Sequence, residues 1–392
     1  MLENRIPEIQ QALAEMGADA WLFTVFQSND PVSIDLLGLG GHFVTRRCYY
    51  LVPRQGSPRR LNHRLEPAML AHLPGEQAHY LTWAEHRAEL LRLVAGCRRL
   101  VAQYSPENQL PSVSRLDAGT ADLLRGAGAE LISSADLAQR FAAVWSAEQL
   151  AGHRRACRAL HEIVHGAFDR VAAALREGRE EHEHAIQQHI LERFERAGLW
   201  SESEPNVSVN AHSADPHYQP GPGKSSPIRR GDFLLIDLWA KEKAPASVYA
   251  DITWCAVCGP PTAKQEEVFR TVAAARDAAW ELVRSRFPHQ TVRGFEVDDA
   301  ARAVIDGAGY GERFFHRTGH SIGISDHGQG ANMDNLETHD TRPLLPMTGF
   351  SIEPGIYLEG DFGVRSEINV ALTAEAAEIT GGEPQRELLR LG

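Results

Sequence analysis

The sequence predicts two domains: an α/β domain over residues 1–143 and an α+β domain over residues 144–392. Three observations lead to this prediction. A chain of 392 residues is longer than one hydrophobic core usually supports. In the first part, short apolar runs alternate with helical patterns. From Ser146 onwards, long amphipathic helices interleave with apolar runs, and a β-hairpin is expected at 232–257.

The first domain begins with a helix over residues 3–16, where apolar residues recur at helical spacing until Gly17. Strands are expected at Ala20–Phe26, Cys48–Val52 and Leu100–Tyr104. Helical patterns lie between and after these strands, for example at Asp117–Gly126. We find no motif that carries chemistry in this domain.

The second domain is predicted to begin with a long helix, because Ser146 and Gln149 form a capping box. A second helix runs to about Arg196, Thr262 and Gln265 cap a third that ends near Val283, and a shorter helix covers 297–306. The expected strands are 206–210, 232–240, 248–257, 350–358 and 364–372.

Composition restricts the classes of partner. A formal net charge of -12 argues against nucleic acid and against an anionic membrane surface. The sequence shows no signal peptide and no apolar stretch of membrane-spanning length. Five cysteines in so long a chain do not form a disulfide framework. We therefore expect a cytoplasmic protein with reduced thiols.

One motif resembles a zinc site. His161 and His165 match the H-E-x-x-H pattern, in which two imidazoles one helical turn apart hold a metal. The alternative is a helix in which Val164 packs inward and both histidines lie on its flank, and we favour this alternative.

Two further motifs are rejected. Residues 221–225 end like a phosphate-binding loop, but Tyr218 stands where the pattern needs glycine, and Pro227 disfavours the following helix. Cys255 and Cys258 are predicted to lie on a strand, which would point them to opposite faces. We expect two ordinary buried cysteines.

Four acids interrupt apolar runs of the second domain: Asp237, Asp251, Glu353 and Glu367. A buried ionised carboxylate without a partner costs several kcal/mol, and Arg365 is the one basic residue inside these runs. Any single acid of this kind is as often paired or capping as functional. Four in one domain indicate a shared charge partner.

Two divalent cations would balance these charges. The stretch 314–327 supplies three histidines, with Gly319 and Gly323 on either side of His320. Oxygen-rich ligation with one imidazole suits Mn²⁺, with Zn²⁺ or Co²⁺ as alternatives. Such a pair would hold a water, lower its pKa and direct it as hydroxide, which predicts a metal-assisted hydrolase.

The order of these residues resembles the pita-bread metallopeptidases, which include methionine aminopeptidase, creatinase, prolidase and aminopeptidase P. The resemblance covers 146–392, and the leading domain resembles the creatinase/prolidase N-terminal domain. It depends on the motifs Gly-His-Ser-Ile-Gly at 319–323, Ile-Glu-Pro-Gly-Ile-Tyr at 352–357 and Gly-Val-Arg-Ser-Glu at 363–367. The resemblance implies pita-bread architecture for the second domain.

The resemblance also implies the ligand set. Asp237 would bind one metal and His320 the other, while Asp251, Glu353 and Glu367 would complete the pair, with Asp251 and Glu367 bridging.

Further active-site roles follow from the same resemblance. His217 matches a substrate-side histidine, and His327 matches the histidine that steadies the tetrahedral intermediate. His316 matches an active-site histidine of the proline-specific members. Arg365 matches an arginine that orients a metal-binding carboxylate, and Glu353 is the candidate for moving the proton.

The sequence departs from the family pattern in three places. Ser321 replaces the usual glycine. The 237–251 segment is longer than usual, which predicts an extended hairpin tip at 241–245. Trp239 replaces a small residue and is expected to crowd the substrate pocket.

The function implied by the resemblance is hydrolysis of an Xaa-Pro bond in dipeptides or short peptides by a metal-bridged hydroxide. We expect a homodimer. One alternative is a creatinase-like C–N hydrolase acting on a small non-peptide, although such enzymes do without the metal set. Another is a non-catalytic peptide-binding module, although such proteins lose the ligands.

Overall fold

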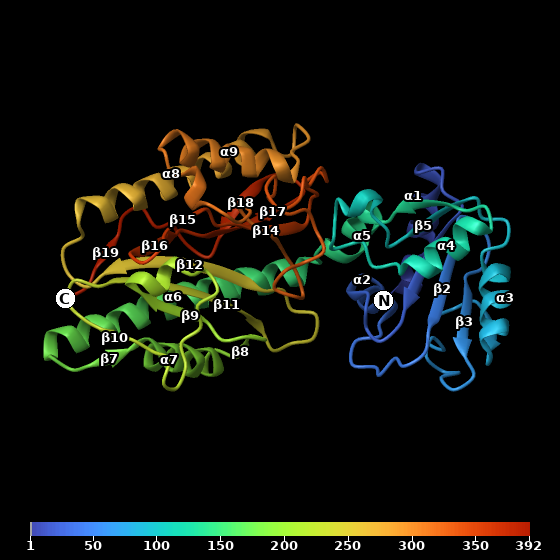
Figure 1. Cartoon of the computed structure of the whole chain (residues 1–392), viewed down its shortest axis with the longest axis horizontal. Helices are drawn as coiled ribbons and strands as arrows, with labels where there is room; N and C mark the ends of the chain where they lie inside the picture. Colours follow the sequence, from blue (N-terminus) through green and yellow to red (C-terminus); the bar gives the residue numbers. More distant parts are fainter. Residues whose placement is uncertain (1) are drawn as a thin grey trace. The chain divides into compact units, whose positions relative to one another are not determined.

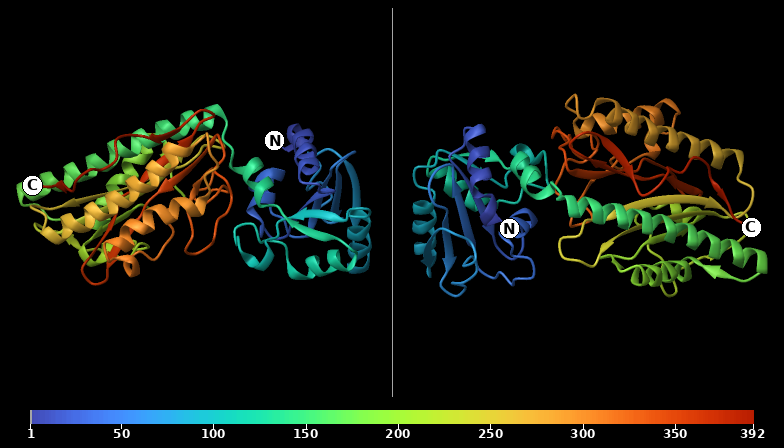
Figure 2. Two further views of the ribbon diagram at one scale, coloured as in Figure 1. Left: turned by 90° about the horizontal axis from the view of Figure 1, so that it is seen from above. Right: turned by 180° about the vertical axis from the view of Figure 1, so that it is seen from behind.

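The computed structural model describes residues 2–392. It forms two compact units, the first ending at Ala142 and the second spanning Ala143–Gly392 (Figures 1 and 2). The division lies within one residue of the predicted domain boundary. None of the helices in residues 2–392 combines the length and the apolar character needed to cross a bilayer.

The first unit is built on a mixed sheet with the strand order β4-β3-β2-β1-β5-β6. The first strand pairs antiparallel with β2 and parallel with β5. The strands are β1 (Ala20–Val25), β2 (Cys48–Pro53), β3 (Arg59–His63), β4 (Glu76–Tyr80), β5 (Arg99–Ala102) and β6 (Glu130–Ser133).

Helices pack against this sheet and form two hydrophobic cores with it. Ile9 and Leu13 of α1 pack with Phe23 in one core, and Leu90 and Leu124 pack with other residues of the sheet in a second. The helical segments are η1 (Leu2–Arg5), α1 (Ile6–Glu15), α2 (Pro31–Leu37), α3 (Trp83–Leu93), η2 (Pro106–Asn108), α4 (Ala118–Gly126), α5 (Ala135–Ala138) and η3 (Gln139–Ala143).

The second unit places strands between two pairs of helices (Figure 1). On one side lie α6 (Ala147–Glu177) and α7 (Glu183–Arg196), and on the other lie α8 (Ala263–Arg286) and α9 (Gly294–Gly307). The predicted capping box of α6 is confirmed, because Ser146 Oγ accepts from the backbone N–H of Gln149 at 3.1 Å. The side chain of Gln149 accepts in return from the backbone N–H of Ser146 at 2.8 Å.

The predicted hairpin is also confirmed. It consists of β11 (Phe233–Glu242) and β12 (Ala250–Val257), which pair antiparallel. Three short strands join the same sheet: β8 (Leu199–Trp200), β9 (Asn206–Val209) and β19 (Leu389–Arg390). A second sheet has the order β13-β14-β17-β18, with β13 (Ser321–Ile322), β14 (Thr348–Ile352), β17 (Ile368–Leu372) and β18 (Ala377–Thr380).

The remaining elements are short. Two small hairpins pair β15 (Gly355–Leu358) with β16 (Phe362–Arg365), and β7 (Glu181–His182) with β10 (Pro227–Ile228). Two 3-10 segments complete the unit, η4 (Asn210–Ala214) and η5 (Gly311–Arg313).

Two strand predictions are wrong in extent. The runs 350–358 and 364–372 were each expected to form one strand, but each divides into two strands with different partners. The first run breaks at Glu353 and Pro354, because proline has no N–H to continue a ladder. The second breaks at Ser366 and Glu367. Both breaks release an acid from the sheet.

The structure agrees with the rejection of the short motifs. His161 and His165 lie on α6 with their rings edge-on to Trp254, at centroid distances of 5.7 Å and 4.6 Å. Cys255 and Cys258 are free and buried, and they belong to different cores. Residues 221–224 form a tight turn that no helix follows.

Candidate active site

The β11–β12 hairpin brings the first two acids together. Asp237 lies opposite Thr253, and Trp239 lies opposite Asp251. Residues that face each other across an antiparallel pair project from the same face, so these side chains share one face of the hairpin. The intervening residues occupy the opposite face, where they pack in the core with α6: Ile236, Leu238, Ile252 and Trp254.

His320 and Glu353 come from neighbouring segments beside β13 and β14. The backbone N–H of His320 donates to Ser351 Oγ at 3.0 Å, and Ser351 Oγ donates to Glu353 Oε1 at 3.1 Å. This close approach requires glycine at position 319, because a Cβ there would lie 1.9 Å from the carbonyl oxygen of Ser351.

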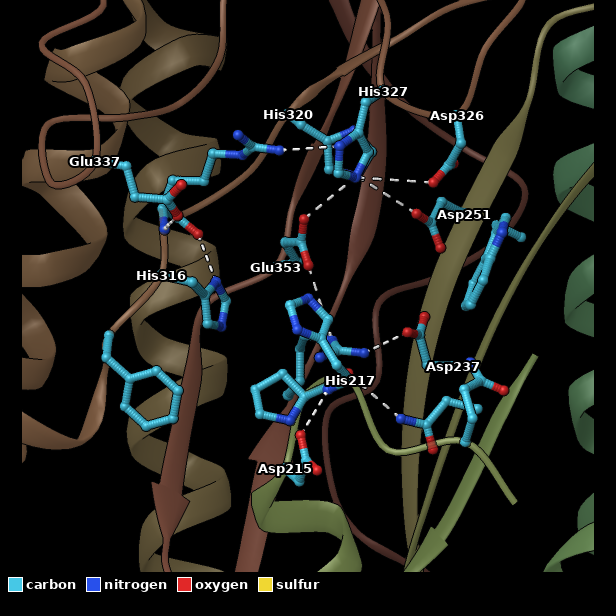
Figure 3. A pocket seen from close by; sticks show the side chains of 17 residues that line it. Asp215, His217, Asp237, Asp251, His316, His320, Asp326, His327, Glu337 and Glu353 are labelled. Atoms are coloured by element: carbon cyan, nitrogen blue, oxygen red, sulfur yellow. Dashed lines mark hydrogen bonds and ion pairs between the residues drawn. The ribbon is translucent and has the colours of Figure 1, made fainter. Parts of the chain in front are cut away.

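The acids meet at the imidazole of His320 (Figure 3). His320 Nε2 lies 3.5 Å from Asp251 Oδ2 and 3.5 Å from Glu353 Oε1. Asp251, His320 and Glu367 are all buried, and each offers a ligand atom within 4.8 Å of the others. Asp251 Oδ1 and Glu367 Oε1 are buried and have no hydrogen-bond partner within residues 2–392.

Burial and mutual repulsion oppose the ionisation of three acids in this cluster. Burial raises the pKa of Asp251, and the nearby carboxylates of Asp326 and Asp237 raise it further. The pKa of Glu367 is raised by burial and by the charge of Asp251. Burial also raises the pKa of Asp237, despite the opposing charge of Arg365. At neutral pH a bound cation would neutralise these three acids more readily than protonation of each carboxylate.

Arg365 holds the first aspartate in place. It is buried at the end of β16, and its guanidinium donates to Asp237 Oδ2 and, at 3.0 Å, to Thr253 Oγ1. The Thr253 hydroxyl lies 3.0 Å from Asp237 Oδ1 and 2.8 Å from Glu367 Oε2, so it can donate to either acid. Arg365 therefore contacts both Asp237 and the threonine that links Asp237 with Glu367.

Glu353 differs from the other acids. Burial opposes its ionisation, but the charges of His320 and Arg365 outweigh burial and lower its pKa. Its two oxygens have separate neighbours: Oε1 faces His320, and Oε2 lies 3.8 Å from Arg365 Nε. Glu353 is thus held as a carboxylate in reach of the cavity.

His316 is tied to the protein through both ring nitrogens. Its Nδ1 lies 2.7 Å from the carbonyl oxygen of Arg317, so Nδ1 carries the proton and donates. Its Nε2 then accepts from the Tyr357 hydroxyl at 2.8 Å. Burial lowers the pKa of His316 to about 4, which agrees with a neutral ring.

A cavity of about 800 Å³ opens over these groups. The predicted site residues that line it are Asp237, Asp251, His217, His316, His320, His327, Glu353 and Arg365. Glu367 is not among the residues that line the cavity, but it is grouped with Asp251 and His320 within 4.8 Å. Trp239 also lines the cavity and donates from Nε1 to Ser203 Oγ at 3.1 Å.

The tautomer of His327 follows from its neighbour. Arg317 approaches His327 Nδ1 at 3.3 Å and can only donate, so Nδ1 accepts and Nε2 carries the proton. The positive charge of His320 is the main cause that lowers the pKa of His327 to about 3, so the ring is neutral. His327 therefore offers an N–H donor beside His320, at a ring-centroid distance of 4.1 Å.

The sequence analysis did not identify several residues that line the cavity: Asp215, Phe315, Arg317, Asp326 and Glu337. Asp326 has the strongest case, since it lies beside His327 and faces the cluster (Figure 3). The sequence does not make it stand out, because Asp326 lies in a loop and does not interrupt an apolar strand. Its adjacency to His327 was the available signal.

The donor set fits divalent cations. Asp251, Glu367 and the imidazole of His320 offer ligand atoms within 4.8 Å of one another, and the pKa values of Asp251, Glu367 and the nearby Asp237 are raised. Oxygen-rich sites of this kind match hard or borderline cations.

Comparisons with known proteins identify the family of this chain and several relatives. Residues 155–374 match the metallopeptidase family M24. The Xaa-Pro dipeptidase of Pyrococcus furiosus is 31% identical over 236 residues, which is 60% of this chain and 62% of that protein. An uncharacterized peptidase of Staphylococcus saprophyticus is 33% identical over 178 residues, 45% of this chain and 47% of that protein. The chain thus matches about half to three fifths of the length of these relatives.

Solved structures cover the whole chain. The dipeptidase PepE of Mycobacterium ulcerans superposes with a TM-score of 0.75 at 23% identity, over 100% of this chain and 98% of that one. The prolidase of Thermococcus sibiricus gives a TM-score of 0.67 at 24% identity, over 100% and 99%. An X-prolyl aminopeptidase of Caenorhabditis elegans gives 0.69 at 16% identity, over 98% and 62%.

These likenesses confirm the predicted fold class, an α/β domain followed by an α+β domain of pita-bread architecture. The family match spans more than half of the chain and contains all five predicted ligands, Asp237, Asp251, His320, Glu353 and Glu367. This chain therefore belongs to the metallopeptidase family M24.

Proposed function

We propose that this chain hydrolyses the peptide bond that precedes proline, in Xaa-Pro dipeptides or short Xaa-Pro peptides, with two divalent cations. The observation that carries the proposal is the buried cluster at His320, where Asp251 and Glu367 each keep an oxygen without a partner. The Pyrococcus furiosus relative, an Xaa-Pro dipeptidase, supports the choice of substrate.

The residues that would hold the cations are Asp237, Asp251, His320, Glu353 and Glu367. Their oxygen-rich character favours Mn²⁺, with Zn²⁺ or Co²⁺ as alternatives. Bound cations would supply Lewis acidity, which acidifies a water molecule and polarises the scissile carbonyl.

His327 would stabilise the carbonyl oxygen as it gains negative charge. Its Nε2–H is free to donate because Nδ1 accepts from Arg317. A fixed donor aimed at a developing oxyanion lowers the barrier without reorganisation during the reaction.

Glu353 would move the proton. The lowered pKa keeps it ionised, so it can accept a proton from the attacking water. It would then deliver that proton to the proline nitrogen, which must be protonated to leave. That nitrogen carries no hydrogen before cleavage, which disables sites that need an N–H there and makes a dedicated site plausible.

The cavity has the volume to hold a dipeptide or a short peptide. At about 800 Å³ it lies within the usual range for small-molecule sites. Phe315 lines it beside His316 and offers an apolar surface to the proline ring. His217 lines the same cavity and would position a substrate carbonyl or carboxylate, while Trp239 restricts the space for Xaa.

The test supplies Mn²⁺ to the purified, metal-stripped protein and compares Ala-Pro, Ala-Pro-Ala and the reversed dipeptide Pro-Ala. We expect Mn²⁺-dependent release of alanine from one or both Xaa-Pro substrates and none from Pro-Ala. Cleavage of Ala-Pro alone identifies a dipeptidase, and cleavage of the tripeptide identifies an aminopeptidase.

Two results would reject the proposal. A protein that binds Ala-Pro but contains no metal and cleaves nothing would be a binding module. A metal-loaded protein that ignores all three peptides but cleaves a small guanidino or amide compound would be a C–N hydrolase of the creatinase kind.

A further inference from the structure

Asp326 immediately precedes His327 in the loop that follows β13, and it lines the active-site cavity. Its Oδ1 is buried and has no hydrogen-bond partner in the part of the chain that the structure describes. Its Oδ2 lies 3.9 Å from His327 Nε2, too far for a hydrogen bond. The side chain as a whole keeps 27% of its surface exposed, so it remains accessible from the cavity.

Other acids in the segment between β13 and β14 form hydrogen bonds or ion pairs that support the structure. Asp334 accepts hydrogen bonds from the backbone N–H groups of Leu336 and Glu337 and so shapes its loop. Asp340 is buried and pairs with Arg342. Among the described residues, nothing donates a hydrogen bond to Asp326. A half-buried acid without a structural duty that faces a substrate cavity indicates a ligand.

A metal ion is one candidate ligand, because His320, Asp326 and His327 offer ligand atoms within 4.8 Å of one another. However, His320 Nε2 can serve only one ion at a time, and it already faces the fully buried group of Asp251 and Glu367. His327 is 65% exposed, and its Nδ1 is engaged by Arg317. The partner of Asp326 is therefore better sought in the substrate.

Charge around the cavity sets the orientation of a peptide. Asp326 lies on the same side as Asp251, and His316 lies on the other side of Glu353 (Figure 3). Arg317 also lines the cavity, where its guanidinium contacts the neutral ring of His327 at 3.3 Å. The carboxylate of a dipeptide would be repelled by the aspartates and attracted to Arg317. Its amino-terminal residue would then lie towards Asp326.

We propose that Asp326 binds a cationic nitrogen of the residue that precedes proline, either its α-ammonium group or a basic side chain. This inference rests on the proposed function, because it assigns a specificity residue to the Xaa side of that substrate. Trp239, across the hairpin from Asp251, forms a further wall of the same cavity and limits the length of neutral side chains.

The test compares wild-type protein with Asp326→Asn, which keeps the shape and removes the charge. The ligands are Lys-Pro, norleucyl-proline, which lacks the lysine ammonium, and lactoyl-proline, which lacks the α-ammonium. KM and kcat are measured with Mn²⁺, dissociation constants by calorimetry, and metal per chain by mass spectrometry. Glu337→Gln serves as the comparison, since it removes another carboxylate from the same cavity.

We expect Asp326→Asn to keep its metal and to weaken binding about tenfold or more, because an ion-paired hydrogen bond is lost. Weaker binding of Lys-Pro alone identifies the basic side chain as the ligand. Weaker binding of both dipeptides, with lactoyl-proline unchanged, identifies the α-ammonium. Glu337→Gln should change neither discrimination.

Three results would overturn the inference: loss of metal in Asp326→Asn, an equal loss for all three ligands, and no change. If wild-type protein cleaves none of the ligands, the proposed function fails separately. Calorimetry on the same ligands then decides the role of Asp326. If wild-type protein binds the cationic ligand more tightly and Asp326→Asn loses this preference, the inference stands. If the preference is unchanged in the variant, or absent from wild type, the inference is rejected.

Discussion

At the residue scale, Asp251 and Glu367 are held close to each other by parts of the fold that have little freedom. The backbone N–H of Asp251 donates to Asn369 Oδ1 at 2.8 Å, and the backbone N–H of Glu367 donates to the carbonyl oxygen of Thr253 at 3.3 Å. Both carboxylates therefore stay in the buried cluster although they repel each other. Because the fold keeps these like charges close together, a bound cation would relieve their repulsion, and this favours cation binding.

Replacement of Asp251 by asparagine tests this argument. We expect Asp251→Asn to lose at least one metal per chain and to lower kcat about 100-fold or more, since ligand loss exceeds the usual effect of an outer contact. In the metal-free state the same variant should be more stable than wild type, because one of two repelling charges is gone. Metal analysis, steady-state kinetics and chelator-treated thermal melts measure these effects.

Asp361→Asn is the matched control, because Asp361 is exposed and pairs with the exposed Lys264. This variant should keep metal content, activity and melting temperature. The argument fails if Asp251→Asn retains both its metal and its activity.

Much of the residue-level site could be predicted from the sequence. Acids within apolar strands stand out because burial of a lone charge is costly, so Asp237, Asp251, Glu353 and Glu367 were visible. Asp326 was not, because loops have no periodicity against which an acid is anomalous. The double hydrogen bonding of His316 was equally invisible, since it depends on Tyr357 arriving from another strand.

At the element scale, α6 supports the site from the opposite face of the hairpin. His153 is fully buried, with Nδ1 2.6 Å from the carbonyl oxygen of Tyr249 and Nε2 2.8 Å from Thr380 Oγ1. One turn further, the Cys157 thiol donates to Asn369 Oδ1 at 3.3 Å. Because Asn369 also contacts the backbone of Asp251, the helix is linked to the acid cluster.

His153 should make stability depend on pH. Burial lowers its pKa to about 4, and the positive charge of Arg154 contributes. Its other close neighbours, Cys157, Thr380 and Trp145, carry no charge, since burial raises the pKa of the Cys157 thiol to about 12. Below pH 6.5 His153 binds a proton in the unfolded chain, whereas in the folded chain it stays neutral down to about pH 4. Stability is therefore complete above pH 6.5 and falls by up to about 3 kcal/mol as pH decreases to 4.

Denaturant unfolding between pH 4 and 7 measures this effect in metal-free protein. His153→Gln should lose stability overall but show a shallower decrease at low pH than wild type. His289→Gln, at an exposed histidine, should keep the wild-type slope. Equal slopes for His153→Gln and wild type would contradict the assignment.

The segment that carries His217 depends on another buried residue, Glu183 at the start of α7. Its Oε1 accepts from the backbone N–H of Val209 and from His212 Nδ1, both at 2.8 Å. Its Oε2 accepts from the Tyr218 hydroxyl at 2.7 Å and from the backbone N–H of Ser226 at 2.6 Å. One carboxylate thus fixes both ends of the 209–226 segment.

Glu183→Gln should loosen this segment, because the amide places N–H groups against donors. We expect a loss of about 1–3 kcal/mol in stability, faster proteolysis within 209–226 and a larger rise in KM than fall in kcat. Glu180→Gln, at an exposed neighbour, is the control. Unchanged proteolysis and KM would show that the 209–226 segment keeps its conformation without the hydrogen bonds of Glu183.

Elements with strong patterns could be predicted from the sequence, and weakly apolar ones could not. The capping boxes of α6 and α8 and the β11–β12 hairpin were predicted, because each has a local chemical cause. Strands β3 and β4 were missed, since their sequences, Arg-Arg-Leu-Asn-His and Glu-Gln-Ala-His-Tyr, contain few apolar residues. Pro354 marks the break at Glu353, because proline has no N–H for a ladder, whereas the break at Glu367 depends on strand partners, which periodicity does not reveal.

At the scale of the whole molecule, each unit has hydrophobic cores of its own. The first unit packs residues such as Trp21 and Leu90 around its sheet. The second packs residues such as Phe269 and Leu160 on either side of its strands. All predicted ligands lie in the second unit, so metal binding should depend on that unit alone.

A chain limited to residues 143–392 tests this prediction. It contains a complete α6 with its Ser146 cap, together with both cores of the second unit. We therefore expect one cooperative thermal transition and the same metal content per chain as the full-length protein, measured by calorimetry and mass spectrometry. Addition of Mn²⁺ should raise the melting temperature of this fragment but not of its Asp251→Asn variant, because binding to the folded state alone stabilises it by mass action. A fragment that unfolds without cooperativity, or folds without binding metal, would show that the first unit contributes to the stability or the metal affinity of the second.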